Sequence, residues 1–318
     1  MSVVENSDTG NDTIAELSLE ERAAKFFGPS ASPVKVDVGA MSHPGKRRPN
    51  NEDHYGVVRR CRSRDVLLTN LPDGFLPHSE DVSYALAVAD GIGGAAFGEL
   101  ASMLALRTAW DLTTSAFKWP FRLNETEAHD ITEALEVYGQ LMHRRVVEQG
   151  RAEPHTAGMG TTLTGAVTVG REVFIAHIGD SRAYLFRDGS LERLTRDHTM
   201  AQQMVDAGVI ASVSHASRLM QHMLVNCLGG NRDEVEVDVS RVQLDDGDRL
   251  LLCTDGLSDM VSDDEIAQIL NSRPAPQDAC QALVDMALDH GGKDNVTVVL
   301  ARFAFGPDRA AGTRNRSA

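Results

Sequence analysis

Short apolar runs separated by polar turns recur along the chain and predict strands rather than helices. The predicted strands span residues 34–41, 84–89, 161–169, 172–178, 182–186, 191–194, 234–239, 249–253 and 296–303. Several of these runs are joined by turns of only two or three residues, such as 170–171 (Gly-Arg) and 187–189 (Arg-Asp-Gly). Connections this short indicate antiparallel hairpins, because parallel strands need a longer crossover.

Helical periodicity falls in pairs, at residues 95–112 with 131–149 and at 263–270 with 277–290. The helices are grouped apart from most strands, whereas a doubly wound sheet requires strand and helix to alternate. The chain is therefore predicted to have an α+β fold. We expect two packed, mostly antiparallel β-sheets, a β-sandwich, flanked by helix pairs in α-β-β-α layers.

The two ends of the chain and two internal segments lack this pattern. Residues 1–30 are predicted to be a mobile N-terminal leader, and residues 306–318 a polar C-terminal tail. Residues 31–305 form the predicted folded domain. Within it, residues 198–228 predict two short helices in a surface excursion, and residues 61–81 predict a loop insertion.

The acidic composition excludes several partners. The chain has 42% hydrophobic and 24% charged residues and a net charge of −15, so neither nucleic acid nor an anionic membrane is an expected partner. No apolar run approaches the roughly 18 residues that span a bilayer. The polar, acidic N-terminus is not a secretory signal, which favours a cytoplasmic protein. The four cysteines never form a Cys-x-x-Cys pair, which argues against a zinc site or a disulfide.

The segment 91–96 (GIGGAA) follows an apolar run and precedes a helical one, as a dinucleotide-binding loop does. Two observations argue against that function. Asp90 would place a carboxylate against the pyrophosphate. The acidic residue expected about 20 positions later is Asp111, which lies in a helical pattern instead of at the end of a second strand. A dinucleotide oxidoreductase stays as an alternative, which a lack of NAD(P)H binding would exclude.

Residues 179–183 (GDSRA) offer a second alternative, because they loosely match the nucleophile elbow of serine hydrolases. That turn requires a helix after the serine, whereas a strand is predicted after Ser181. Ser181 is therefore interpreted as a turn hydroxyl.

Four aspartates end apolar runs or begin glycine turns: Asp90, Asp180, Asp255 and Asp294. A single aspartate of this kind is usually a turn former, but four on separate strands can converge at one rim of stacked sheets. Carboxylates held close together repel one another and require cations. Ligation by oxygen alone favours Mg²⁺ or Mn²⁺ over zinc. Beside such a cluster, the guanidinium of Arg48 is suited to bind two oxygens of a phosphate.

Seven short motifs that contain these residues occur in a fixed order. They are Arg48-x-x-Asn51-Glu52-Asp53, Ala89-Asp90-Gly91-Ile92-Gly93-Gly94, Gly158-Met159-Gly160-Thr161-Thr162-Leu163, Gly179-Asp180-Ser181-Arg182, Leu194-Thr195-Arg196-Asp197-His198, Cys253-Thr254-Asp255-Gly256-Leu257 and Gly292-Lys293-Asp294-Asn295-Val296-Thr297. With them the chain closely resembles the metal-dependent type 2C serine/threonine protein phosphatases, particularly the bacterial form. The likeness covers residues 34–304, and it is specific because all seven motifs keep their order.

The resemblance implies a two-metal site at one end of the sandwich. Asp90 would bridge both ions, and the carbonyl of Gly91 would help to hold one of them. Asp255 and Asp294 would hold the other. Asp180, together with Asp255, corresponds to a third metal site of bacterial members. The expected cofactors are therefore two or three Mg²⁺ or Mn²⁺ ions.

Other residues gain roles around these ligands from the same resemblance. Glu52 and Asp53 would orient metal-bound waters, and Arg48 would grip the substrate phosphate. Residues 198–228 correspond to the flap of bacterial members, and we call this segment the flap. Residues 31–305 would then be the phosphatase catalytic domain.

Ile92 departs from the animal enzymes, which carry a histidine directly after the aspartate-glycine pair as a proposed general acid. Bacterial relatives also have an apolar residue there, so the proton donor to the leaving oxygen stays unassigned. The histidines nearest the motifs in sequence are His54, His177 and His198. A lone histidine is, however, more often a core or surface residue.

The function implied by the resemblance is hydrolysis of phosphoserine and phosphothreonine in proteins by a metal-activated water, without a phosphoenzyme intermediate. Two cations about 4 Å apart neutralise the phosphate and lower the pKa of a water, and Arg48 adds charge stabilisation. The expected partners are phosphorylated proteins, opposite a serine/threonine kinase, and a monomer is expected. The alternative is a signalling module that only binds a partner, against which the intact metal aspartates argue.

Overall fold

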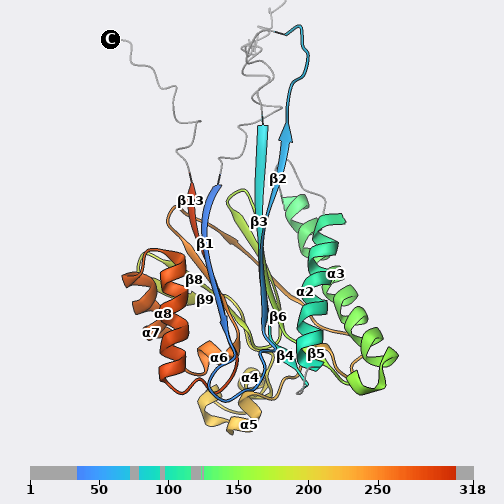
Figure 1. The fold of residues 1–318 in the computed structure, drawn as a ribbon, viewed down its shortest axis with the longest axis vertical. Helices are drawn as coiled ribbons and strands as arrows, with labels where there is room; N and C mark the ends of the chain where they lie inside the picture. The colour runs from blue at the N-terminus through green and yellow to red at the C-terminus, as the bar shows by residue number, and fades with distance from the viewer. Residues whose placement is uncertain (1–33, 72–78, 94–96, 116–122, 124, 306–318) are drawn as a thin grey trace, which may run out of the picture. The chain divides into compact units, whose positions relative to one another are not determined.

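Two five-stranded sheets pack face to face at the centre of the protein (Figure 1). The computed structural model describes residues 34–71, 79–93, 97–115, 123 and 125–305. In both large sheets every pair of neighbouring strands is antiparallel.

The first sheet has the strand order β1-β13-β12-β8-β9 and the second the order β11-β7-β6-β3-β2. The strands of the first sheet are β1 (Val34–His43), β8 (Arg182–Arg187), β9 (Ser190–Arg193), β12 (Arg249–Cys253) and β13 (Val296–Phe305). Those of the second are β2 (His54–Arg64), β3 (Ser79–Ala89), β6 (Leu163–Val169), β7 (Glu172–Ile178) and β11 (Asp238–Gln243). The hairpins predicted from the short turns are present, because β6 pairs with β7 and β8 with β9.

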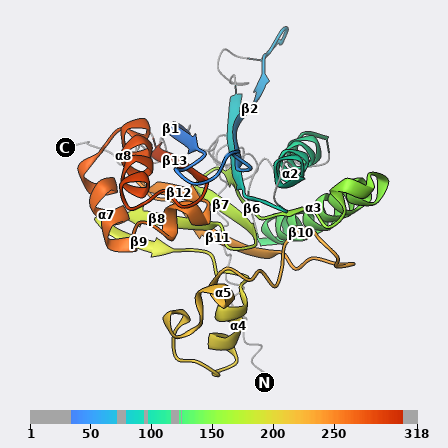
Figure 2. The same cartoon turned by 60° about the horizontal axis from the view of Figure 1, so that its bottom comes forward.

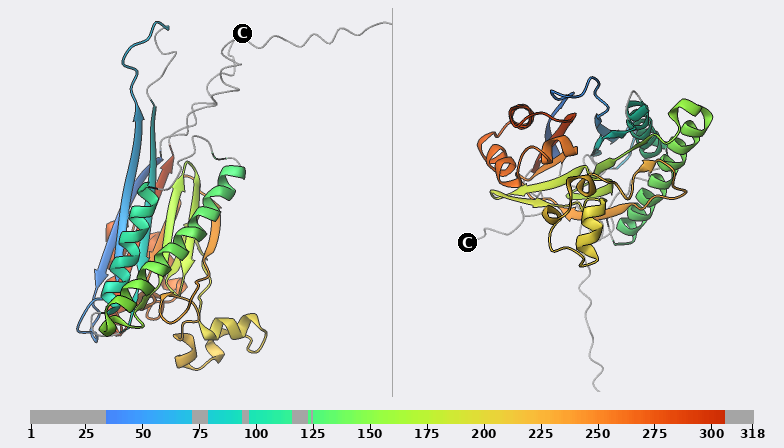
Figure 3. Two further views of the ribbon diagram at one scale, coloured as in Figure 1. Left: turned by 90° about the vertical axis from the view of Figure 1, so that its right-hand side faces the viewer. Right: turned by 90° about the horizontal axis from the view of Figure 1, so that it is seen from below.

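A pair of helices covers the outer face of each sheet (Figures 1 and 3). The helices α2 (Phe97–Ser115) and α3 (Glu125–Ala152) lie on the second sheet, and α7 (Asp263–Ser272) and α8 (Pro276–Asp289) lie on the first. The layers therefore run α-β-β-α, which confirms the predicted fold class.

Both faces of β12 are buried, which explains its unbroken apolar sequence. Leu250 and Leu252 pack in the core between the sheets, whereas Leu251 and Cys253 pack against the side chains of α7 and α8. All four side chains are completely buried. A strand packed on both faces holds the residues that follow it in a fixed position, and β12 leads through Thr254 to Asp255.

A small three-stranded sheet lies at one end of the sandwich. Its strands, β4 (Gly91–Ile92), β5 (Gly160–Thr161) and β10 (Leu228–Gly229), have the order β10-β5-β4. The pairing of β4 with β5 brings Gly91 opposite Thr161, which are 70 positions apart in the chain. This is the end at which the strand-end aspartates gather.

The flap projects away from the body of the sandwich (Figure 2). It contains α4 (Met200–Asp206), a 3₁₀ turn (Val213–His215) and α5 (Arg218–Gln221), so the two predicted short helices are present. A backbone bridge between Thr199 and Leu224 joins the two ends of the excursion.

Two sequence predictions are wrong at the edges of the sheets. The sequence indicates a loop insertion at 61–81 and no strand before it, but β2 continues to Arg64 and β3 begins at Ser79. The strand expected at 234–239 lies further along, as β11. Both β2 and β11 are edge strands, and polar residues on their exposed sides obscure the apolar pattern.

The predicted leader (1–30) and tail (306–318) lie outside the described residues, so the domain boundaries stay predictions. The described residues belong to one unit, Pro33–Gly306. Within the part of the chain that the structure describes, no helix has the length and apolar character to cross a membrane.

Gly256 lies in the short helix α6 (Asp255–Ser258), and its substitution tests how closely this end of the fold is packed. A Cβ atom at Gly256 would lie 1.8 Å from the carbonyl oxygen of Asn295. We expect Gly256→Ala to lower the free energy of unfolding by about 2–3 kcal/mol or more. The control is Gly165→Ala in β6, where the nearest atom is 3.6 Å away. Equal stability of the two variants in urea denaturation would contradict this packing.

Candidate active site

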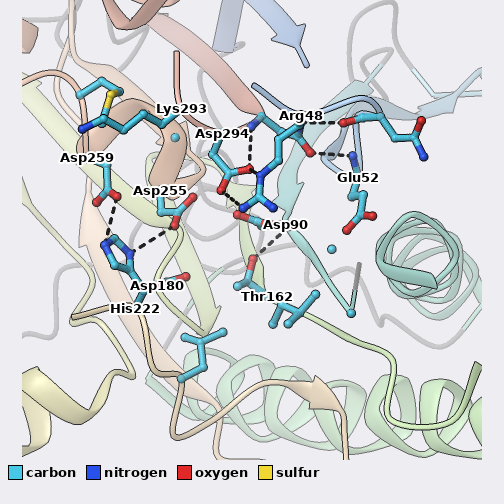
Figure 4. A pocket seen from close by; sticks show the side chains of 18 of the residues that line it. Arg48, Glu52, Asp90, Thr162, Asp180, His222, Asp255, Asp259, Lys293 and Asp294 are labelled. Atoms are coloured by element: carbon cyan, nitrogen blue, oxygen red, sulfur yellow. Dashed lines mark hydrogen bonds and ion pairs between the residues drawn. The ribbon is translucent and has the colours of Figure 1, made fainter. Parts of the chain in front are cut away.

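A cavity of about 590 Å³ opens at the end of the sandwich where the four aspartates lie (Figure 4). Seven of the eight predicted site residues line it: Arg48, Glu52, Asp90, Gly91, Asp180, Asp255 and Asp294. The eighth, Asp53, is only 4% exposed. Its Oδ2 accepts a hydrogen bond of 2.8 Å from Thr254, the residue before Asp255. The structure thus brings together residues that the sequence distributes over more than 240 positions.

Thr161 of β5 and the following residue, Thr162, fix the backbone of Asp90. The Asp90 amide donates to Thr162 Oγ1 at 3.0 Å, and the Asp90 carbonyl accepts from Thr161 Oγ1 at 2.7 Å and from the Thr162 amide at 2.9 Å. With its main chain held on both sides, Asp90 extends its carboxylate into the cavity.

Asp255 follows β12 and begins α6. Thr254 joins this turn to the neighbouring strand, because its hydroxyl accepts a hydrogen bond of 3.0 Å from the amide of Thr297 and donates to Asp53. Two oxygens of this group, Asp53 Oδ1 and Asp255 Oδ1, are buried without a hydrogen-bond partner. Buried polar atoms of this kind are costly unless a ligand satisfies them.

Arg48 and Asp294 form a two-point ion pair at the mouth of the cavity (Figure 4). Arg48 Nε donates to Asp294 Oδ1 at 2.8 Å, and Arg48 Nη2 to Asp294 Oδ2 at 2.5 Å. The side chains are 55% and 36% exposed, respectively. The sequence predicts both residues at the site but does not indicate that they bind each other.

The N-terminal part of α2 packs so closely beside Asp90 that positions 91 and 98 both require glycine. A Cβ atom on Gly91 would lie 2.2 Å from the carbonyl oxygen of Gly98, and a Cβ atom on Gly98 would lie 2.3 Å from Glu52 Oε2. Close backbone packing therefore accounts for Gly91, and its sheet neighbours are antiparallel strands. These features do not match a dinucleotide-binding loop, which belongs to a parallel sheet.

Burial and mutual repulsion raise the pKa values of the clustered carboxyls. Burial, followed by the charges of Asp53, Asp255 and Asp180, raises the pKa of Asp90 well above its usual range. Burial and the charge of Asp255 do the same for the pKa of Asp180. The pKa of Asp53 rises to about 7, mainly because of burial. A cluster that resists ionisation in this way fits bound cations, which stabilise the charged form.

The donor atoms fit hard divalent cations. The carboxylates of Asp90, Asp180, Asp255 and Asp294 line the cavity, and ligation by oxygen selects Mg²⁺ or Mn²⁺. The buried oxygens without partners, on Asp53 and Asp255, provide acceptors for metal ions or their waters.

The three histidines expected near the motifs contact other groups. His54 Nδ1 lies 2.9 Å from Ser102 Oγ. His177 is buried between Thr164 and the carbonyl of Arg196, and burial lowers its pKa to about 4. His198 lies 3.0 Å from Asp238. None of the three is among the residues that line the cavity.

The histidine that lines the cavity is His222 of the flap, which the sequence interpretation missed. Its Nδ1 lies 3.8 Å from Asp255 Oδ2, and its Nε2 lies 3.4 Å from Asp259 Oδ2. These carboxylates raise the pKa of His222 above its ordinary value. His222 belongs to no motif, and only its place in a Ser/His-rich part of the flap could have drawn notice.

The surroundings of Ser181 confirm that its hydroxyl has a structural role. It is completely buried, and its Oγ lies 2.7 Å from Thr162 Oγ1. The residue is followed by β8 instead of a helix. These contacts exclude a nucleophile elbow.

Fold and site together define a class of protein: an α-β-β-α sandwich with a carboxylate-lined centre for divalent cations at one end. Residues 72–289 match the sequence model of protein phosphatase 2C, and the chain belongs to that family. The resemblance found in the seven motifs is thereby confirmed.

The chain is similar in sequence to phosphatases from bacteria. Serine/threonine protein phosphatase PstP of Mycobacterium tuberculosis is 38% identical over 228 residues, which cover 70% of this chain and 42% of PstP. Serine/threonine phosphatase stp of Listeria welshimeri is 31% identical over 259 residues, which cover 80% of this chain and 91% of stp. The chain thus spans less than half the length of the mycobacterial relative.

Solved structures agree with the fold. The catalytic domain of PstP in complex with two manganese ions has 33% identity and a TM-score of 0.64, and the match covers 86% of this chain and 100% of that structure. The serine/threonine phosphatase of S. agalactiae has 28% identity and a TM-score of 0.67, with 84% and 99% covered.

The raised pKa of Asp53 predicts an unusual pH dependence for the metal-free protein. The folded state holds a proton up to about pH 7, whereas the unfolded chain releases it near 3.8. The contribution of Asp53 to the free energy of unfolding is therefore greatest below pH 3.8 and is lost as the pH rises to about 7. In chelator, Asp53→Asn should reduce this loss, which urea denaturation between pH 4 and pH 8 would measure as a difference of up to about 4 kcal/mol.

The control for this measurement is Asp130→Asn, an exposed substitution on α3. It should retain the pH slope of the wild type. The same slope in all three proteins would show that Asp53 does not titrate in this range.

Proposed function

We propose that this chain is a metal-dependent protein serine/threonine phosphatase that hydrolyses phosphoserine and phosphothreonine. The observation that carries the proposal is the convergence of four carboxylates and one arginine on a single cavity: Asp90, Asp180, Asp255, Asp294 and Arg48. The relatives are named as serine/threonine phosphatases, which supports the same activity.

The carboxylates and a backbone carbonyl would hold the cations. We assign Asp90 to a position between two Mg²⁺ or Mn²⁺ ions, with the Gly91 carbonyl on one ion and Asp255 and Asp294 on the other. Asp180 is assigned to a third ion. When bound, such ions neutralise the phosphate dianion and supply a water of lowered pKa as the nucleophile. The manganese-bound structure of the PstP catalytic domain supports this choice of cofactor.

Arg48 is suited to grip the phosphate. Its guanidinium already makes a two-point contact with the carboxylate of Asp294, and a phosphate monoester offers a similar pair of oxygens. The side chain is 55% exposed, so it can turn from Asp294 to a substrate at the mouth of the cavity. Arg48 would then stabilise charge on the transferring phosphoryl group.

Asp53 and Glu52 are assigned to the waters around the metal ions and not to the ions themselves. Thr254 fixes one oxygen of the Asp53 carboxylate, which leaves Oδ1 as an acceptor for a water. The Glu52 amide donates to Asn295 Oδ1 at 2.8 Å, next to Asp294 in the chain. These contacts support the assignment of both acids to the orientation of metal-bound waters.

Direct attack by water agrees with the side chains at hand. Among the described residues that line the cavity there is no serine or cysteine, and the hydroxyl of Ser181 is buried outside it. A phosphoenzyme on serine or cysteine would therefore lack its nucleophile, and the aspartates of the cavity are assigned to the cations. The proton donor to the leaving oxygen stays unassigned.

The substrates, the partners, the oligomeric state and the location in the cell are part of the same proposal. The substrates would be phosphorylated proteins, opposite a serine/threonine kinase, and the protein would act as a cytoplasmic monomer without nucleic acid or membrane partners. The presence of all four metal aspartates counts against the alternative, a signalling module that only binds a partner.

Metal removal tests the proposed function directly. Chelation should abolish hydrolysis of a phosphothreonine peptide and of an aryl phosphate, and Mn²⁺ or Mg²⁺ should restore it. Asp90→Asn should lose at least about 100-fold in kcat without rescue by metal, because it removes a ligand and not merely a supporting contact. The exposed Asp130→Asn should behave like the wild type. Full activity in chelator would rule out the metal-dependent mechanism.

Substitution of Arg48 separates phosphate binding from metal binding. Loss of a charged, two-point hydrogen bond costs about 1.5–3 kcal/mol, so Arg48→Ala should raise KM about 10- to 100-fold. Arg48→Lys should recover only part of the loss, because a point charge cannot form the same fork. The neighbouring Arg47→Ala is the matched control, since Arg47 does not line the cavity. An unchanged KM in Arg48→Ala would assign Arg48 to the surface.

A further inference from the structure

Two neighbouring loops form one wall of the cavity mouth. They are residues 44–51, between β1 and β2, and residues 290–295, between α8 and β13. The Lys46 amide donates to the Gly292 carbonyl at 2.7 Å, which joins the two loops through their backbones. A Cβ atom on Gly45 would lie only 2.2 Å from the carbonyl oxygen of Asp294. Packing this close fixes the side chains of both loops relative to one another.

We call these two loops the basic wall, because their charge is opposite to the net charge of −15 of the whole chain. The wall carries four exposed cationic side chains, Lys46, Arg47, Arg48 and Lys293, and a single carboxylate, Asp294. Asp294 already pairs with Arg48. Among the described residues, the other three cations form no ion pair. Of these three, only Lys293 lines the cavity, so the wall presents one unpaired ammonium group to a substrate.

Lys293 lies beside the position assigned to the phosphate. It directly precedes Asp294, whose carboxylate holds Arg48. Figure 4 shows its side chain extended along the cavity mouth, on the side of Asp294 opposite Glu52. An extended peptide advances about 3.3 Å per residue. When Arg48 holds the phosphate, the ammonium group of Lys293 is therefore within reach of a side chain about one to three residues away.

A lysine that only balanced the acidic cavity would pair with one of its carboxylates. Lys293 has Asp294 next to it in the chain, and Asp259 lines the same cavity. It forms an ion pair with neither among the residues that the structure describes. An exposed ammonium group that is free of protein partners can bind an anionic group of a ligand at the cost of little more than its own hydration.

We propose that Lys293 is a specificity-determining residue that binds a second negative group of the substrate, about one to three residues from the phosphoserine or phosphothreonine. The inference rests on the proposed function and names its substrate class, phosphoproteins with acidic neighbours of the phosphorylated residue. The second group is a carboxylate or another phosphate, since both offer charged oxygens to an ammonium group. Arg48 would hold the reacting phosphate and Lys293 the neighbouring charge.

Hydrolysis of matched peptides tests the proposal. Phosphothreonine peptides of one sequence would carry glutamate or glutamine at each of the three positions on either side, and kcat/KM would be measured in Mn²⁺. At the best position the wild type should prefer glutamate about two- to fivefold, as expected for an exposed ion pair. Lys293→Ala should abolish the preference, and Lys293→Glu should reverse it in favour of a peptide with lysine there.

The ratio within one variant isolates recognition of the flanking charge. Both peptides undergo the same reaction at the same metal site, so a variant that weakens metal binding changes both rates alike. A purely structural role of Lys293 could not produce the reversal in Lys293→Glu. An equal ratio in the wild type and Lys293→Ala, or no preference at any position in the wild type, would contradict the proposal.

The matched control is Arg47→Ala, which removes a cation from the basic wall that does not line the cavity. It should keep the preference of the wild type. If Arg47→Ala lowers the preference as much as Lys293→Ala does, the field of the whole wall selects the substrate, and the assignment to Lys293 is wrong.

Binding of peptides with a non-hydrolysable phosphonate in place of the phosphate separates this proposal from the proposed function. Fluorescence anisotropy with the full chain in Mn²⁺ would compare glutamine, glutamate and a second phosphonate at the flanking position. A stronger preference for the phosphonate than for glutamate would identify the second group as phosphate, and otherwise it is a carboxylate. Selective binding that requires Lys293, without hydrolysis, would support the proposal and contradict the phosphatase activity. Hydrolysis with the same ratio in every variant would have the opposite meaning, and a lack of both binding and hydrolysis would contradict both.

Discussion

Carboxylates repel one another most strongly where burial removes water, and the rest of the structure must offset this repulsion. Asp53 and Asp180 are buried and Asp90 is half-buried at one end of the sandwich. They lie within each other's electrostatic range or that of Asp255. Holding them together costs free energy, which burial of apolar surface between the sheets and under the four helices must offset. Strands packed on both faces, such as β12, prevent the carboxylates from moving apart.

Most of the fold could be predicted because its central strands and helices have clear apolar patterns. The predicted limits of β7 and β12 are those observed, since both strands are buried on at least one full face. Edge strands were harder to recognise. The second half of β2 reads RRCRSR, and every position of β11 is exposed or half-buried. Their pairing depends on backbone hydrogen bonds to a neighbour, which leave little trace in the side chains.

The site could be predicted as far as its residues belong to turns at the ends of strands. Asp90, Asp180 and Asp255 follow apolar runs, and the cavity brings them together as the seven motifs imply. His222 could not be found in this way, because it reaches the cavity through the path of the flap and not through a local pattern. Proximity in sequence to a motif was equally misleading for His177, which faces the interior.

The ion pair between Arg48 and Asp294 has a thermodynamic consequence. While Asp294 binds the guanidinium, the same oxygens are not free for a cation, and Arg48 is not free for a phosphate. If Asp294 holds a cation and Arg48 a phosphate, as proposed, binding of either ligand would break the same ion pair. Each ligand would then remove a free-energy cost that the other would otherwise meet. Such coupling is reciprocal by linkage. Inorganic phosphate, the product, would therefore tighten the hold on the metal as much as the metal tightens the hold on phosphate.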